Sequence, residues 1–186
     1  MRSPGRHPVS YAALLLALLA ATGCSPTFNW RNVQLDSRAG PLAALLPCKP
    51  DRAERPVSLD GGASVPLSVV GCTAGGVTFT LAHLPVAPGT EAAAALLQWR
   101  AANVARLGAV ESQLDASFSP VGALALPAAG MATIEARDAA GQPVRQRAAW
   151  FARAGSGGVE LFQAALLGGK IDPVAVETFF SSLRFN

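Results

Sequence analysis

Short apolar or alternating runs dominate the chain after Leu42, and they predict β-strands. In the first half the predicted strands are 42–46, 55–59, 65–70 and 77–84. In the second half they are 123–126, 131–137, 144–152 and 159–167. The turn signals Asp60-Gly61-Gly62 and Gly75-Gly76 separate strands of the first half. Consecutive strands with short connections predict an antiparallel meander, although residues 42–46 could equally form one helical turn.

A helix is predicted between the two sets of strands. Thr90 is the expected N-cap, with Glu91 in the first turn, and the helix ends near Gly108. Its apolar stripe at three- and four-residue spacing comprises Ala95, Leu96, Trp99, Ala102 and Ala105. Trp99 is therefore expected to be a core residue rather than one that stacks on a ligand.

A second helix is predicted near residue 173. Asp172 is its N-cap and Pro173 its first residue, and the apolar stripe comprises Val176, Phe179, Phe180 and Leu183. The order of strands, helix, strands and helix predicts an α+β domain, in which two helices cover an antiparallel sheet.

The first 23 residues have the composition of an export signal. Arg2 and Arg6 precede an apolar core from residue 11 to residue 21, which is too short to span a bilayer. The segment Ala21-Thr22-Gly23-Cys24 resembles the lipobox of bacterial lipoproteins. This resemblance implies that a signal peptidase removes residues 1–23 and that Cys24 becomes the acylated first residue. The alternatives are an ordinary secretory signal, which would leave Cys24 as an unpaired thiol, and an uncleaved anchor.

The lipobox resemblance divides the chain into a signal peptide (1–23), a tether (24–41) and a single domain (42–186). Ser25 follows Cys24, whereas an aspartate there would favour the inner membrane in enteric bacteria. The resemblance thus implies the outer membrane, facing the periplasm, with the lipid on Cys24 as the membrane anchor. The tether carries apolar residues between Phe28 and Leu35. They are expected to dock as a first short strand, or else to await a partner.

The charge of the chain does not favour nucleic-acid binding. The formal net charge is +3, from 15 basic and 12 acidic side chains. Because Arg2 and Arg6 leave with the signal, 13 basic side chains remain and the mature charge is +1. A nearly neutral chain has no field that would hold a polyanion.

Cys48 and Cys72 are the cysteines that remain once Cys24 carries lipid. Export places them where thiols are oxidised, so we predict a disulfide between them. The alternative is two buried, unpaired thiols that act as small apolar groups.

A further resemblance covers most of residues 24–186. The motif Leu46-Pro47-Cys48-Lys49-Pro50, the apolar strand before Cys72 and the closing stretch from Glu177 to Phe185 resemble a group of uncharacterised proteobacterial lipoproteins. The order of elements is also similar to the fold of the photosystem subunit PsbP. Neither family supplies a catalytic residue, and fold alone does not give function.

Few residues are candidates for chemistry. His83 is the histidine outside the signal, and neither a second histidine nor a Cys-x-x-Cys motif accompanies it, so no metal site or cofactor is predicted. It is expected to be a surface or satisfied core histidine. Ser156 lies among glycines and is interpreted as part of a hairpin turn, since the Gly-x-Ser-x-Gly pattern of hydrolases is missing. We therefore predict that the protein is not an enzyme.

One charged feature stands out on the predicted strands. Arg137, Arg145, Arg147 and Arg153 would share one sheet face, opposite Val144, Ala148, Trp150 and Ala152. They are a candidate basic contact face for a lipid headgroup, a cell-wall polymer or an acidic protein surface. The alternative is an ordinary solvated strand face, with Glu135 offsetting part of the charge.

Taken together, these features predict a periplasm-facing lipoprotein that serves as a binding or accessory module, with an envelope protein as its partner. The alternative is a small-ligand carrier with an apolar cleft between helix and sheet, and a third class is a hydrolase with a concealed site. An exposed apolar patch would favour the first, a deep cavity the second, and a histidine beside a serine or carboxylate the third.

Overall fold

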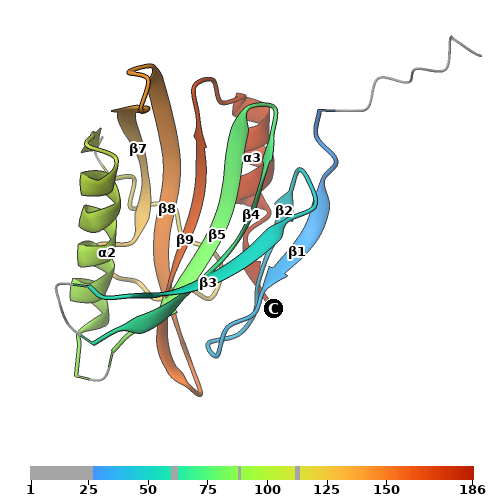
Figure 1. Cartoon of the computed structure of the whole chain (residues 1–186). Coiled ribbons are helices and arrows are strands. Elements are labelled where there is room, and N and C mark those ends of the chain that lie inside the picture. The colour runs from blue at the N-terminus through green and yellow to red at the C-terminus, as the bar shows by residue number, and fades with distance from the viewer. Residues whose placement is uncertain (1–26, 60–62, 88, 112–113) are drawn as a thin grey trace, which may run out of the picture.

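The computed structural model describes residues 27–59, 63–87, 89–111 and 114–186, which form two antiparallel sheets and two helices (Figure 1). The large sheet contains, in spatial order, β3 (Asp51–Val57), β4 (Val65–Ala74), β5 (Val77–Pro85), β9 (Gly158–Gly168), β8 (Pro143–Gly155), β7 (Gly130–Arg137) and β6 (Val110–Glu111). The small sheet contains β1 (Arg31–Leu35), β2 (Leu42–Leu46) and β10 (Arg184–Phe185). The helices are α2 (Ala92–Arg106) and α3 (Pro173–Ser181). The predicted α+β class is confirmed.

The two faces of the large sheet carry separate apolar cores. Because side chains alternate along a strand, neighbouring residues such as Phe151 and Trp150 point to opposite faces. Phe151 packs with Phe79 and Phe179 in the core beneath α3 and the small sheet. Trp150 packs with Leu84 and Leu96 in the core beneath α2. The molecule is therefore layered, with α2 on one face of the sheet and the small sheet with α3 on the other (Figure 1).

Most predicted strands are confirmed, including the first, in which residues 42–46 form β2 rather than a helical turn. The segment 123–126 is the exception, since it forms no named strand. Leu124 N donates one hydrogen bond to Ala152 O, at 2.7 Å, but Pro120 and Pro127 flank the segment and cannot donate to a ladder. The predicted turn at 60–62 lies outside the described residues.

The apolar part of the predicted tether is docked. β1 pairs with β2 from Arg31 opposite Leu46 to Leu35 opposite Leu42, and Val33 and Leu35 are buried. Residues 31–35 are thus part of the fold, as expected for a first short strand. The predicted signal peptide, its predicted cleavage site and Cys24 lie outside the described residues.

The helix termini follow the predictions in part. Asp172 caps α3 as expected, because its side chain accepts a hydrogen bond from Val174 N at 2.9 Å. The N-cap of α2, however, is Glu91 and not Thr90, and its side chain makes no capping bond. The predicted stripe is wrong at Ala102 and Ala105, which are exposed. Asn103 is buried in their place, because it lies one turn after Trp99 on the side that faces the sheet.

The predicted disulfide is present. Cys48 follows β2 and Cys72 lies in β4, and their Cα atoms are 6.0 Å apart. The bond therefore ties the small sheet to the large one.

Candidate functional site

A cleft of about 410 Å³ lies between α2, the large sheet and the end of β3. Residues of β5, β8 and β9 form its floor, among them Thr80, Gln146 and Gln163. Trp99 and Asn103 of α2 form one wall. We call it the amide cleft, after the side chains of Asn103, Gln146 and Gln163 that line it. Its volume falls in the range of small-molecule sites in proteins.

The three amide side chains are buried and incompletely paired. Asn103 is 7% exposed, Gln146 4% and Gln163 8%. Asn103 Oδ1, Gln146 Oε1 and Gln163 Nε2 have no hydrogen-bond partner. A buried polar atom without a partner costs about 1–3 kcal/mol, so a core seldom keeps several of them together. Three such atoms around one cleft fit a site in which a ligand supplies the missing donors and acceptors.

The local sequence explains how these amides come to line the same cleft. Gln146 is on the same face of β8 as Ala148 and Trp150, and Gln163 shares a face of β9 with Leu161 and Ala165. Both strands thus present an otherwise apolar face to α2, interrupted by one amide each. The periodicity of apolar residues does not point to these three amides, because they are polar exceptions among the buried residues of their helix and strands. A glutamine at an apolar position of two adjacent strands is the signal that could have found them.

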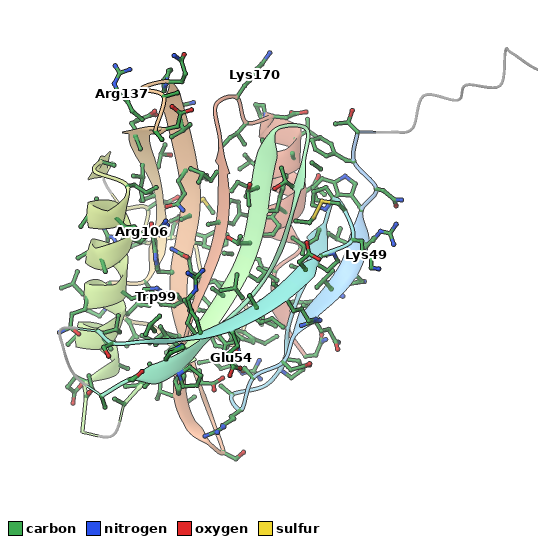
Figure 2. The ribbon with its side chains drawn as sticks, viewed as in Figure 1. Lys49, Glu54, Trp99, Arg106, Arg137 and Lys170 are labelled. Carbon is green, nitrogen blue, oxygen red and sulfur yellow. A yellow bond between two sulfur atoms is a disulfide. The ribbon has the colours of Figure 1, made fainter. Side chains whose placement is uncertain are left out.

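The charges of the amide cleft have one sign. Arg55 and Arg106 line it, whereas no aspartate or glutamate does so among the described residues. Both arginines are exposed, and neither forms an ion pair with a described residue. Figure 2 shows Arg106 and Trp99 on α2, between the helix and the strands of the large sheet. The cleft is therefore suited to a ligand with negative charge.

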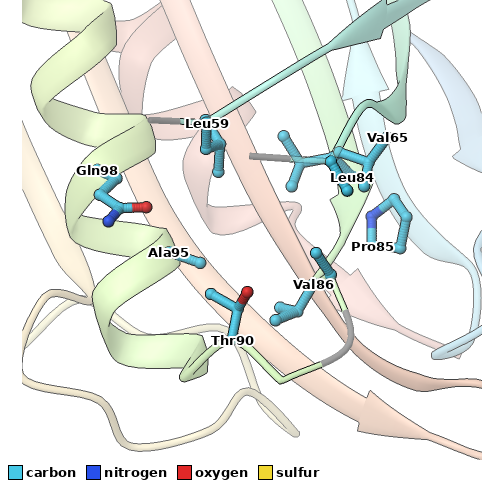
Figure 3. A pocket seen from close by; sticks show the side chains of 10 residues that line it. Leu59, Val65, Leu84, Pro85, Val86, Thr90, Ala95 and Gln98 are labelled. Carbon is cyan, nitrogen blue, oxygen red and sulfur yellow. The ribbon is translucent and has the colours of Figure 1, made fainter. Parts of the chain in front are cut away.

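A second, apolar pocket of about 230 Å³ adjoins the cleft nearer the start of α2 (Figure 3). Its apolar lining includes Leu59, Val65, Leu84 and Ala95. Leu59 lines both spaces. Eight of the ten residues that line this pocket are apolar, and Thr90 and Gln98 are the polar exceptions, whereas half of the residues that line the amide cleft are charged, hydroxyl or amide side chains.

His83 lies on the opposite face of the sheet, close to a buried carboxylate. Its Nδ1 is 3.5 Å from Glu160 Oε2, and the two residues are 8% and 3% exposed. Burial raises the pKa of Glu160, but the neighbouring His83 and Ser37 side chains and the Ala39 N–H, which donates to Oε2 at 3.4 Å, outweigh it. The pKa of this carboxyl is therefore below its usual value. His83 is thus buried, but its Nδ1 makes no hydrogen bond to a described residue, so the expected satisfied core histidine is found only as far as its burial.

The surroundings of His83 lack the contact that a serine hydrolase needs. Ser68 lies directly opposite His83 in the register of β4 and β5, but its hydroxyl donates to Glu54 Oε2 at 3.2 Å. No hydrogen bond joins a serine hydroxyl to His83 in the described part of the chain. The nucleophile–base pair is thus not assembled here. Ser156 lies in the β8–β9 turn, as predicted.

The four arginines of the candidate basic face share one side of the sheet but do not form one group. Arg145 Nε donates to Glu135 Oε1 at 2.7 Å, and Arg147 Nη1 donates to Thr133 Oγ1 at 2.9 Å. Arg153 lies at the other end of β8, over the ring of Phe185 at 4.4 Å. The buried residues Ala149 and Phe151 separate it from Arg147.

Arg137 donates to Gly141 O at 2.8 Å, in the turn between β7 and β8, and lies at that tip in Figure 2. Only Arg137, Arg145 and Arg147 therefore come near one another along the strands.

The described residues meet the requirements of neither a metal site nor a membrane-spanning helix. They include no cluster of histidine, cysteine, aspartate or glutamate that could hold a metal ion. Neither of the two described helices is long and apolar enough to cross a membrane.

No protein-family model, curated protein or solved structure matches this chain. The proposed function therefore rests on the amide cleft and on the sequence.

Proposed function

We propose that this protein is an envelope lipoprotein, anchored by lipid on Cys24, whose domain binds a small ligand in the amide cleft. The observation that carries the proposal is the set of three unpartnered amide atoms on Asn103, Gln146 and Gln163. Leucine or alanine at these three positions would remove the unpaired amide atoms from the cleft, although Trp150 Nε1, on the same face of β8, would stay unpaired. Unpaired amides at these positions do not stabilise the fold, whereas they would serve to bind a ligand in the cleft.

Two observations favour ligand binding over the other classes. The large exposed apolar side chains of the described residues are Leu97, Val121 and Val174. Leu97 on α2 and Val174 on α3 lie on opposite sides of the large sheet, so they do not belong to one patch. His83 has a carboxylate neighbour but no serine hydroxyl bonded to it. The cleft, in contrast, lies between helix and sheet, where the carrier class requires it. It is more polar than the expected apolar cleft.

The envelope location rests on the sequence. The positive start, short apolar core and lipobox-like segment up to Cys24 support export and lipidation. The Cys48–Cys72 disulfide is consistent with an oxidising compartment. The resemblance to proteobacterial lipoproteins stays a prediction.

Ligand binding is tested by asking what the purified full-length protein carries. We expect native mass spectrometry to detect a bound small molecule, and the doubly substituted Gln146→Leu/Gln163→Leu protein to lose at least nine-tenths of it. The variant should keep its melting temperature or gain a few degrees, because two buried amide groups are removed. Gln142→Leu, on the exposed β7–β8 turn, is the matched control and should retain the ligand. Equal occupancy in all three proteins would contradict the proposal.

A further inference from the structure

The side of α2 that faces the sheet changes in chemical character along its length. Arg106, Asn103, Trp99 and Ala95 follow one another at spacings of three and four residues, so they lie on one side of the helix. Arg106, Asn103 and Trp99 line the amide cleft, and Ala95 lines the apolar pocket. At 1.5 Å per residue the series spans about 16 Å. A cation, an amide, an aromatic ring and an apolar wall thus follow in order.

The sheet opposite α2 has the same order. Gln146 and Gln163 contribute to the amide cleft, whereas Leu84 and Val65 contribute to the apolar pocket. Both layers therefore present polar groups to one part of a ligand and apolar groups to the next part. This arrangement fits a molecule whose own chemistry changes along its length.

We infer that the ligand is an N-acylated amino acid or short peptide with a free carboxylate; the inference rests on the proposed function. Its carboxylate would lie near Arg106 and Arg55, which meet no carboxylate of the described lining. Its amide N–H would donate to Asn103 Oδ1 or Gln146 Oε1, and its carbonyl would accept from Gln163 Nε2. Its acyl group would occupy the apolar pocket beside Leu59 and Leu84.

Simpler ligands satisfy only part of the site. A fatty acid supplies the carboxylate and the apolar chain but leaves the amide atoms of Asn103, Gln146 and Gln163 unpaired. A sugar phosphate supplies charge and hydrogen bonds but nothing for the pocket around Leu59 and Val65. The amide cleft offers two unpaired acceptors, Asn103 Oδ1 and Gln146 Oε1, and one unpaired donor, Gln163 Nε2. The donor and the acceptor of one peptide group pair two of these three atoms.

The inference is tested by calorimetric titration of the full-length protein, freed of bound ligand, with N-octanoyl-L-alanine and three relatives. O-octanoyl-L-lactate replaces the amide N–H by an ester oxygen, N-octanoyl-L-alaninamide removes the charge, and decanoate lacks the amide. We expect N-octanoyl-L-alanine to bind at least tenfold more tightly than the carboxamide or decanoate, and at least fivefold more tightly than the ester. These ratios compare ligands on the native protein, so no variant has to fold.

Two variants connect each preference to its residue. Arg106→Gln should reduce the preference for the carboxylate over the carboxamide to less than threefold, whereas Arg31→Gln, at an exposed position of β1, should leave it unchanged. Gln146→Leu should remove the preference for the amide over the ester, and Gln142→Leu should not.

The possible failures are distinguishable because the side-chain amide signals of Asn103, Gln146 and Gln163 can be followed by NMR in the same titrations. In one outcome, decanoate or the ester binds as tightly as N-octanoyl-L-alanine and shifts these signals. That result would overturn the inferred ligand class, although the cleft would remain a binding site. In another outcome, the signals shift with none of the four compounds and the purified protein carries no ligand. That result would overturn both the inferred ligand class and the proposed function.

Discussion

At the scale of single residues, Asn103, Gln146 and Gln163 are placed where packing alone would select apolar side chains. Trp150, Ala148 and Leu161 occupy the neighbouring positions of the same faces and are fully buried. The rule that buried positions on a strand or helix face are apolar is broken mainly at functional sites, where some stability is lost in favour of binding. The amides are therefore the residues whose exchange should separate binding from folding most clearly.

Glu160 gives a prediction for the dependence of stability on pH. Although burial alone would raise its pKa, the neighbouring His83 and Ser37 side chains and the hydrogen bond from Ala39 N lower it on folding. The ionised carboxylate therefore stabilises the fold at pH values above its unfolded pKa, about 4.3, and this contribution is lost as the pH falls through the lower folded value.

We expect the free energy of unfolding of the native protein, from urea titrations between pH 6 and pH 3, to fall more steeply on acidification than that of Glu160→Gln. Glu177→Gln, at an exposed position of α3, is the matched control and should follow the native curve. Parallel curves for the native protein and Glu160→Gln would show that this carboxylate is not preferentially stabilised by folding.

At the scale of elements, the Cys48–Cys72 bond joins the end of β2 to β4 and closes a loop with a sequence separation of 24 residues. On the chain-entropy estimate a loop of this size stabilises the fold by about 3–4 kcal/mol. The doubly substituted Cys48→Ala/Cys72→Ala protein should lose about that much free energy of unfolding in urea. Reductant should destabilise the native protein by a similar amount and leave the variant unchanged. A variant as stable as the oxidised native protein would contradict this prediction.

Strong alternation explains why most elements could be predicted from the sequence. The strands β5, β8 and β9 and the helix α3 have clear periodicity and recognisable caps or turns. The small sheet could not be predicted as a unit, because β10 contains two residues and its pairing with β2 is set by tertiary packing. Residues 123–126 have the composition of a strand, but the flanking prolines and the tight turns at Ala123 and Ala129 prevent it from joining a ladder.

The candidate site was predictable only in outline. A cleft between helix and sheet was an explicit alternative, and the side of α2 that contains Trp99 was placed correctly. The amides of the cleft could not be derived from periodicity, because Asn103, Gln146 and Gln163 are exceptions to it. Their unpaired atoms become visible only when three elements are packed together.

At the scale of the whole molecule, the folded domain and its attachment are separate predictions. Residues 1–26 lie outside the described residues, so the attachment rests on the lipobox-like segment before Cys24. We expect the mature protein to begin at Cys24, to carry acyl groups detectable by mass spectrometry and to be recovered with membranes. Cys24→Ala should lose the acyl groups and the membrane recovery, whereas Cys48→Ala/Cys72→Ala should keep both. A native protein of unmodified mass would contradict lipidation.

The small sheet unites distant parts of the chain, because β2 pairs with β1 on one side and with β10 on the other. Arg184 lies opposite Ala43, and Asn186 N donates to Pro41 O at 3.1 Å. During synthesis β2 therefore keeps one open edge until residues 184 and 185 have emerged, more than a hundred residues later. A truncated product that lacks them would expose this edge for pairing with a second copy. Residues 184 and 185 thus protect the start of β2 from pairing with another chain.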